Sequence, residues 1–257
     1  MKKANYIVRK IWSNKILNYL AYYSVIMFLT LSSCIKDRSL TLEIPQKGFD
    51  LVQHVPKGAK GRANNTLYQL PRSINNSEFN SNELNTFIDS MYNVMIKNAG
   101  VGIAANQLGK RLQIFIIEAK IDNPRYKILG PVKKQVFINP IITGVSISRK
   151  NFWHGCLSAK GEKRGNVATF EWIDYECKNP KGEIISGRLD GFAAVIFQHE
   201  FRHLMNGTYL DFAKQFESKN ELDQKLERKE LPFFEFTNDT LPLLIEGYKI
   251  GKSIEEY

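Results

Sequence analysis

The chain has 257 residues, of which 43% are hydrophobic and 24% charged, a balance that predicts a globular protein with a real core. Its formal charge is +10, but five of the bases and no acid precede residue 34, and the remaining bases are scattered. Proteins that bind nucleic acid carry dense basic stripes, so this distribution argues against nucleic acid as a partner. Three cysteines are too few for a disulfide framework.

Residues 1–33 have the anatomy of a secretory signal. A basic start is followed by an apolar run over residues 16–31, and small residues then precede Cys34. These are the three parts of a cleavable signal. The ending Leu-Ser-Ser-Cys resembles the bacterial lipobox, which implies that Cys34 is lipidated and anchors an exported lipoprotein to a membrane.

Two other interpretations of this segment stay open. It could be an uncleaved membrane helix, in which case the positive-inside rule still places the following domain outside the cytoplasm. Alternatively, Met1 is a misassigned start, Met27 is the true first residue, and the protein is cytoplasmic.

The rest of the chain divides into a lead-in, a catalytic domain and a C-terminal extension. The lead-in is polar, rich in Gly and Lys, and contains Pro45 and Pro56, which predicts an irregular tether. The sequence indicates little about the role of the extension. The predicted parts are a signal peptide at 1–33, a tether at 34–65, a catalytic domain at 66–215 and an extension at 216–257.

A helix is predicted after residue 80. Asn80 as N-cap and Glu83 three residues later resemble a capping box, and apolar residues repeat at helical spacing as far as Met95. Gly100 is a natural stop. This apolar stripe is interpreted as plain core packing.

Short β-like runs follow, and an Asn-Pro-Lys-Gly turn at residues 179–182 joins the last two into a predicted hairpin. A second helix is predicted from about Phe192 to Leu204, ended by Asn206-Gly207. Strands between two helices favour an α+β domain with antiparallel sheets. The predicted strands cover residues 112–117, 136–142, 167–177 and 183–188.

The second helix contains the pattern H-E-x-x-H. At 3.6 residues per turn, His199 and His203 project from one face and can hold one ion together. Glu200 lies beside the first of them, where it can reach a water molecule rather than the metal. Two such histidines can also be surface or satisfied core residues, but only four histidines occur in the chain and the helix is apolar before the motif.

A catalytic site with two histidines needs a third protein ligand and one open position. Cys156 is the obvious candidate, because the preceding Gly155 lets backbone approach an ion closely. A disulfide between Cys156 and Cys177 is the alternative, ranked second.

These segments resemble the peptide deformylase family. Residues 100–107 resemble its first motif, G-x-G-x-A-A-x-Q; residues 155–158 most of its second, E-G-C-L-S; and residues 198–203 its third, Q-H-E-x-D-H. The three occur in the family's order, and the resemblance covers roughly residues 67–212. It implies antiparallel sheets packed around a central H-E-x-x-H helix.

The resemblance also implies a metal centre. Cys156, His199 and His203 would be the ligands of one divalent ion, with Fe²⁺ favoured and Zn²⁺, Ni²⁺ or Co²⁺ possible occupants. Glu200 would be the general base and then the general acid. The reaction would remove the formyl group from N-formylmethionyl peptides.

The remaining implied roles concern the substrate. The Gln107 side-chain amide and the Leu157 backbone N–H would stabilise the oxyanion, a task in which each donor typically contributes about 3 kcal/mol. Val101 and Gly102 would lie along an extended peptide, with Gly102 offering its backbone.

Three apolar residues precede His199 on about the same helical face: Phe192, Val195 and Ile196. They can wall a pocket for a methionine-like side chain. Core packing is an equally good interpretation, since such a stripe is expected on a buried helix.

The chain departs from the family pattern at three positions. His154 stands where the family has Glu, Arg202 where it has Asp, and Thr169 where it usually has Arg. We hypothesise that Arg202 supplies the positive charge that Thr169 lacks. His154 is also a candidate extra ligand, although active sites normally keep one position open.

Three functions compete: a deformylase acting on formyl or other N-acyl peptides, a metalloprotease of ordinary peptide specificity, and a peptide-binding lipoprotein on a retired deformylase scaffold. Cys156 and the segment before Gln107 disfavour the protease. The presence of Glu200 disfavours the binder, which needs no base.

Overall fold

The computed structural model describes residues 42–257 except 124–128, 160–162, 229–234 and 237–240. The predicted signal and Cys34 therefore lie outside the described residues. The described α-helices are α2 (Asn82–Lys97), α3 (Gly191–Leu204) and α4 (Lys219–Glu227). The strands are β1 (Gly102–Ala104), β2 (Ile114–Ala119), β3 (Val132–Val145), β4 (Arg149–His154), β5 (Lys163–Phe170), β6 (Trp172–Lys178), β7 (Ile184–Asp190), β8 (Gln215–Ser218) and β9 (Glu235–Phe236).

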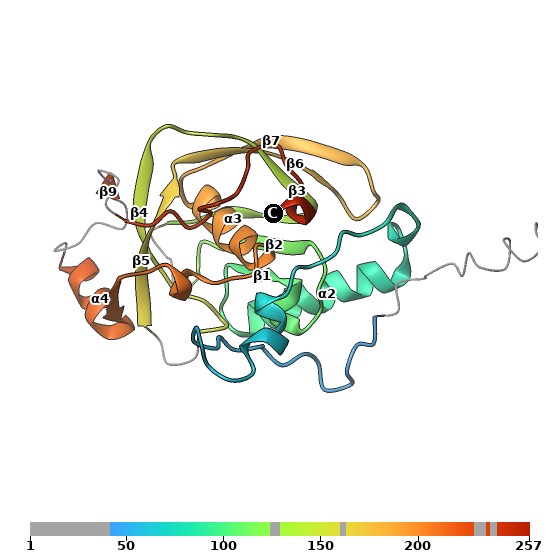
Figure 1. The fold of residues 1–257 in the computed structure, drawn as a ribbon, viewed down its shortest axis with the longest axis horizontal. Coiled ribbons are helices and arrows are strands. Elements are labelled where there is room, and N and C mark those ends of the chain that lie inside the picture. The colour runs from blue at the N-terminus through green and yellow to red at the C-terminus, as the bar shows by residue number, and fades with distance from the viewer. Residues whose placement is uncertain (1–41, 124–128, 160–162, 229–234, 237–240) are drawn as a thin grey trace, which may run out of the picture. The chain divides into compact units, whose positions relative to one another are not determined.

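These strands form two antiparallel sheets. One has the order β1-β2-β3-β6-β7 and the other the order β8-β5-β4-β9. Helix α3 lies centrally, with β4 and β5 to one side and the strands of the larger sheet around it (Figure 1). The prediction of an α+β domain with antiparallel sheets packed around the H-E-x-x-H helix is confirmed.

Helix α2 begins one residue later than its predicted cap implied. Its N-cap is Ser81, whose side-chain oxygen accepts the Leu84 N–H, whereas Asn80 adopts a left-handed backbone conformation with φ of 57°. Ser and Asn are both good caps, so residue type alone does not choose between neighbours. The apolar stripe packs into the core as predicted, and the helix ends at Lys97, before Gly100.

The predicted strand at 167–177 is wrong as one element. It is divided between β5 and β6, and these strands belong to different sheets with Glu171 at the junction. The chain changes sheets there without any Gly or Pro, so the sequence carries no break signal. The predicted hairpin is present: β6 pairs with β7, and the Gly182 N–H donates to the Asn179 carbonyl.

Two consecutive side chains attach α3 to the two sheets. The Phe197 ring lies edge-on to the rings of Phe115 and Phe137 in the larger sheet, with centroids 5.0 Å apart in both pairs. The Gln198 amide exchanges hydrogen bonds with the Phe170 backbone at the end of β5, at 2.8 and 2.9 Å. The residues that follow are therefore placed by both sheets.

From residue 42 on, the segment predicted as a tether is irregular, but its second half is attached to the domain. The Val52 N–H donates to the Gln107 carbonyl at 2.8 Å, and the His54 N–H donates to the Ser158 carbonyl at 2.7 Å. The Tyr68 hydroxyl lies 2.6 Å from His54 Nδ1. This segment thus supports the two loops that carry Gln107 and Ser158.

The chain after residue 215 belongs to the same compact unit as the rest of the described residues. The predicted boundary falls at the start of β8, which pairs with β5. Further on, the Leu244 N–H donates to the Ala168 carbonyl, and Ile254 is fully buried in the main core.

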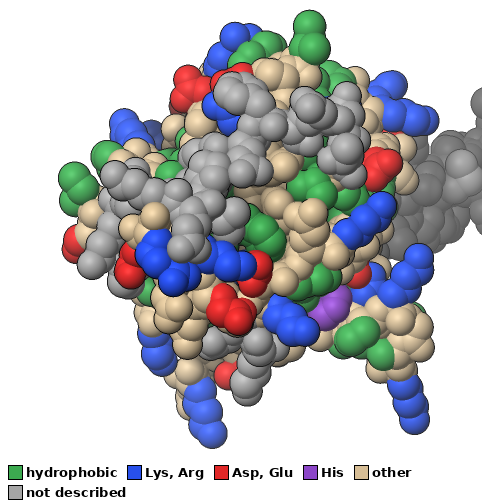
Figure 2. All heavy atoms as spheres, turned by 90° about the vertical axis from the view of Figure 1, so that its left-hand side faces the viewer, with side chains coloured by type: hydrophobic (Ala, Val, Ile, Leu, Met, Phe, Trp, Pro, Cys, Tyr) green, Lys and Arg blue, Asp and Glu red, His purple; other side chains and the backbone are tan. Residues whose placement is uncertain are grey.

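The surface mixes charge types. On the face shown in Figure 2, basic and acidic side chains are interspersed with polar and hydrophobic ones. Within the part of the chain that is described, no helix combines the length and hydrophobicity needed to cross a bilayer.

If the C-terminal stretch is an integral part of the core, Ile254→Ala will lower the free energy of unfolding by about 2–5 kcal/mol, since it removes a fully buried side chain. Ile147→Ala is the matched control, because Ile147 is fully exposed and surface changes usually stay within about 0.5 kcal/mol. Urea denaturation measures both. Equal stability of the two variants would contradict this role of the C-terminal stretch.

Candidate metal centre

Cys156, His199 and His203 converge in the structure. One potential ligand atom from each lies within 4.8 Å of the other two. Cys156 Sγ is 3.3 Å from His203 Nε2. A thiolate and two imidazoles form a donor set that suits divalent transition metals.

Chain geometry explains the convergence. His199 and His203 lie one turn apart on α3, and Cys156 follows β4 directly. A Cβ on Gly155 would lie 2.1 Å from a terminal nitrogen of Arg164, so any other residue between β4 and the cysteine would displace that guanidinium. Neither Cys156 nor Cys177 is in a disulfide, so the disulfide alternative is wrong.

Two N–H donors face the cysteine sulfur. The Gln107 side-chain amide lies 3.3 Å from Cys156 Sγ, and the Ser158 backbone N–H lies at the same distance. Gln107 is oriented by its oxygen, which accepts the Ala104 N–H at 2.8 Å. The amide N–H groups of Gln107 are thus turned toward the cluster, where they stabilise negative charge.

Glu200 follows His199 on α3 and is buried. Its Oε2 has no hydrogen-bond partner among the described residues, and burial raises the pKa of its carboxyl well above the usual range. A Cβ on Gly102 would lie 2.3 Å from Glu200 Oε1, so the glycine makes room for the carboxyl. An unpaired buried carboxyl is costly unless a ligand or water completes its hydrogen bonds.

The imidazoles of the cluster are held in the neutral form. Burial, with the Arg164 guanidinium adding to it, lowers the pKa of His199 to about 4. Burial and the neighbouring His199 lower the pKa of His203 well below its usual range. Metal ligation requires neutral imidazoles, so both rings are ready to bind at neutral pH.

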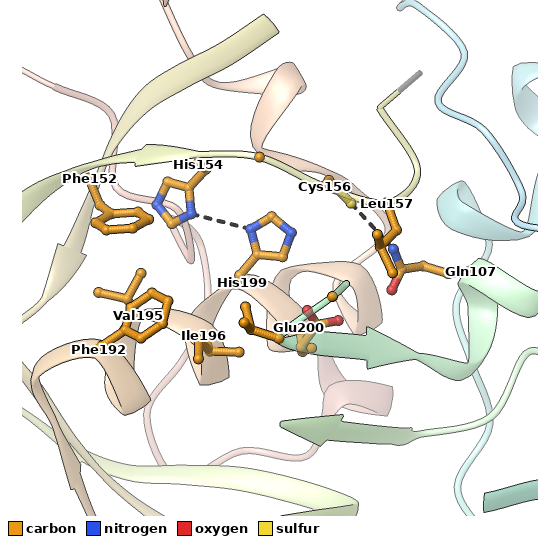
Figure 3. A pocket seen from close by; sticks show the side chains of 14 residues that line it. Gln107, Phe152, His154, Cys156, Leu157, Phe192, Val195, Ile196, His199 and Glu200 are labelled. Atoms are coloured by element: carbon orange, nitrogen blue, oxygen red, sulfur yellow. Dashed lines mark hydrogen bonds between the residues drawn. The ribbon is translucent and has the colours of Figure 1, made fainter. Parts of the chain in front are cut away.

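An apolar pocket adjoins the cluster. Phe192, Val195 and Ile196 line it together with His199 and Glu200, and Figure 3 shows these side chains on one side of the site with Gln107 on the other. Further lining comes from Val101, Gly102, Gln107, Cys156 and Leu157. Of the residues predicted for the site, all but His203 line this pocket, and His203 joins them through its cluster with Cys156 and His199.

His154 is not a ligand in this arrangement. Its Nδ1 faces His199 Nδ1 at 3.2 Å, whereas the other ring nitrogen of His199 turns toward Cys156 (Figure 3). The metal-binding group accordingly omits His154. The proposal of an extra ligand at this position is wrong, because β4 places the ring behind His199.

Arg202 brings a positive charge close to the cluster, where it adds to the lowering of the pKa of His203, and its role in place of Thr169 stays a prediction. Its guanidinium lies over the Phe212 ring at 4.3 Å, and burial lowers its pKa, an effect that the charge interaction and hydrogen bond with Tyr257 partly oppose. The Thr169 hydroxyl donates a hydrogen bond to the Lys150 carbonyl. Arg202 therefore links α3 to Phe212 and Tyr257.

Sequence reasoning missed Arg164. This buried side chain fills the space beside Gly155 and acts electrostatically on His154 and His199. Its place in β5, opposite β4, brings it there. The sequence shows a charged residue ten positions after His154, but it does not show the strand register that brings this residue to the cluster.

A cation-accepting cluster, a buried carboxyl and an oriented amide around one apolar pocket define the centre of a metallohydrolase. The polypeptide deformylase family model matches residues 63–219, which is more than half of the chain. The chain belongs to the peptide deformylase family and is a metallohydrolase of that type.

Comparison with individual proteins gives the same family. Peptide deformylase of Leptospira biflexa is 34% identical over 155 residues, covering 59% of this chain and 84% of the relative. Peptide deformylase 2 of Pseudomonas putida is 39% identical over 138 residues, covering 52% and 76%. The class I type b enzyme of Acinetobacter baumannii with bound Met-Ala-Ser is 29% identical, with a TM-score of 0.58 over 64% of this chain and 97% of that one.

Alkylation distinguishes the two described cysteines. In folded, chelator-treated protein, iodoacetamide should modify the partly exposed Cys156, and added Zn²⁺ should protect it. Cys177 should stay unmodified until the protein is denatured, because it is buried and its pKa is raised to about 12. Peptide mapping by mass spectrometry follows each site. Equal modification of Cys156 with and without Zn²⁺ would contradict the ligand assignment.

Proposed function

We propose that this protein removes the formyl group from N-formylmethionyl peptides. The observation that carries the proposal is the buried, unpartnered Glu200 carboxyl beside the cluster of Cys156, His199 and His203, at one end of an apolar pocket. Family membership and the names of the relatives support the same reaction.

In this proposal Cys156, His199 and His203 hold one divalent cation, with Fe²⁺ favoured by resemblance and Zn²⁺, Ni²⁺ or Co²⁺ as other occupants. Such a cation supplies Lewis-acid chemistry, polarising a carbonyl and lowering the pKa of water to about 7. The orphaned Glu200 Oε2 and the donor set of the cluster fit that group.

Glu200 accepts the proton of the attacking water and returns it to the leaving amine. A general acid–base group needs reach and a pKa near the working pH, and burial moves the pKa of this carboxyl upward from its usual range. The Gln107 amide and the Leu157 backbone N–H donate to the oxyanion. Gln107 is suited to this because its oxygen is already held by Ala104.

The peptide binds along β1, which is the edge strand of its sheet. The Glu118 N–H donates to the Val101 carbonyl, so the alternation of an antiparallel ladder turns the backbone groups of Gly102 toward the open edge. An extended peptide can add there as a further strand. Its first side chain would enter the pocket lined by Phe192, Val195 and Ile196. The A. baumannii relative is described with Met-Ala-Ser bound.

Assays of the metal-loaded protein on formyl-Met, acetyl-Met and internal peptide bonds test the substrate class. Turnover of formyl-Met peptides far above the others is expected. Cleavage of internal bonds would indicate the protease, and acetyl-Met turnover another N-acyl substrate. Binding of these peptides without any turnover would indicate a peptide-binding protein.

Glu200→Gln should lower kcat by about 10²–10⁴-fold, since the amide cannot carry the proton, while bound metal stays stoichiometric. Glu176→Gln is the control, because Glu176 is exposed on β6. Elemental analysis and steady-state kinetics measure both properties. Undiminished kcat in Glu200→Gln would exclude Glu200 as the proton carrier.

We propose further that the protein is exported and anchored to a membrane through lipidated Cys34, on the signal anatomy of residues 1–33. In a bacterial host, the wild-type chain should incorporate radioactive palmitate and sediment with membranes, and Cys34→Ser should do neither. Cys177→Ser controls for loss of a thiol. Labelling that persists in Cys34→Ser would overturn the anchor, and an unlabelled wild-type protein in the cytosol would favour a start at Met27.

A further inference from the structure

The contact between His154 and His199 is a feature that the catalytic roles do not use. His154 is the last residue of β4 and is almost fully buried. Its ring stacks on His199 with centroids 5.4 Å apart and an interplanar angle of 20°, and it also faces Tyr209 and the edge of Phe152. The ring is therefore fixed by packing on several sides.

The two histidines meet through like atoms. Nδ1 of His154 lies 3.2 Å from Nδ1 of His199, within hydrogen-bond distance (Figure 3). A hydrogen bond requires one nitrogen to carry the proton and the other to offer a lone pair. Two lone pairs at this distance would repel, and buried rings favour the neutral form, in which each carries one proton.

The ring nitrogen of His199 that would bind the metal determines which of the two Nδ1 atoms donates the hydrogen bond. The second ring nitrogen of His199 faces Cys156, so it must be unprotonated to serve as a ligand. The single proton of neutral His199 then resides on Nδ1 and is donated to His154 Nδ1. His154 must accept there.

We infer that His154 is a positioning residue, whose Nδ1 lone pair fixes the tautomer and ring orientation of the ligand His199. The inference rests on the proposed metal centre and deepens it. Partners of this kind orient ligands and make them more basic. A neutral imidazole supplies orientation without adding a negative charge behind the ligand, which distinguishes it from a carboxylate.

Three substitutions of His154 test its role as hydrogen-bond acceptor separately from the packing of its ring. In His154→Asn the side-chain oxygen lies as many bonds from Cα as Nδ1 does, so an acceptor is kept. In His154→Gln the oxygen lies one bond further, at the place of Nε2. In His154→Phe the ring is kept and every acceptor is removed.

Zn²⁺ affinity, measured by competition with a chelator, should fall about 10–100-fold in H154F and H154Q and stay within about threefold of wild type in H154N. The visible absorption bands of the Co²⁺-loaded protein should shift in H154F and H154Q and be restored in H154N, which a purely structural role of the ring would not produce. Thermal denaturation of the metal-free variants shows which of them fold. If H154F does not fold, the comparison of H154N with H154Q decides alone.

Wild-type affinity in H154F, or an equal loss in H154N and H154Q, would overturn the inference. Failure of the proposed function looks different. In that case the wild-type protein binds Zn²⁺ with the expected dependence on residue 154 but does not turn over formyl-Met peptides. A wild-type protein that binds no Zn²⁺ or Co²⁺ would remove the metal centre and the inference together.

Discussion

The structure depends on holding one largely apolar helix between two sheets while its polar side chains stay buried. Phe197 and Gln198 provide the attachment, one to each sheet, directly before His199 and Glu200. Burying imidazole and carboxyl groups is unfavourable unless partners complete their interactions. The loop from β4 and the side chain of Gln107 supply those partners on the cluster side, and the lead-in segment supports both from behind. The site is therefore placed by the same contacts that build the core.

The sequence predicted those parts of this arrangement that depend only on residues close together in the chain. Spacing along α3 places His199 and His203 on one face whatever surrounds the helix, and the Asn-Pro-Lys-Gly turn determines the β6–β7 hairpin locally. Strand β4 was missed because its polar sequence, Arg-Lys-Asn-Phe-Trp-His, lacks a regular alternation of apolar residues. The change of sheet at Glu171 was missed because tertiary pairing, not a turn residue, divides β5 from β6.

Contacts between strands and loops that are far apart in the sequence could not be predicted from such local patterns. The Arg164 side chain reaches the cluster only because β5 pairs with β4, and the Nδ1 atoms of His154 and His199 meet only because β4 ends behind α3. Arg202 is a further case. Its position next to His203 indicated a charge for the site, and the guanidinium does act on His203, but the sequence did not reveal that it also packs on Phe212 and interacts with Tyr257.

The substituted positions have separate physical consequences. Arg202 packs on Phe212 and interacts with Tyr257, and its charge, which Asp211 and Glu246 also favour, adds to the lowering of the pKa of His203. His154 brings no charge, and burial with His199 and Arg164 lowers its pKa well below the usual range. The groups behind the ligands are thus neutral or positive, and together with burial they lower the pKa of His199 and of His203, which favours the neutral imidazoles. Because ligation requires the neutral imidazole, these neighbours leave the cluster competent to hold a cation, with Glu200 as the carboxyl beside it.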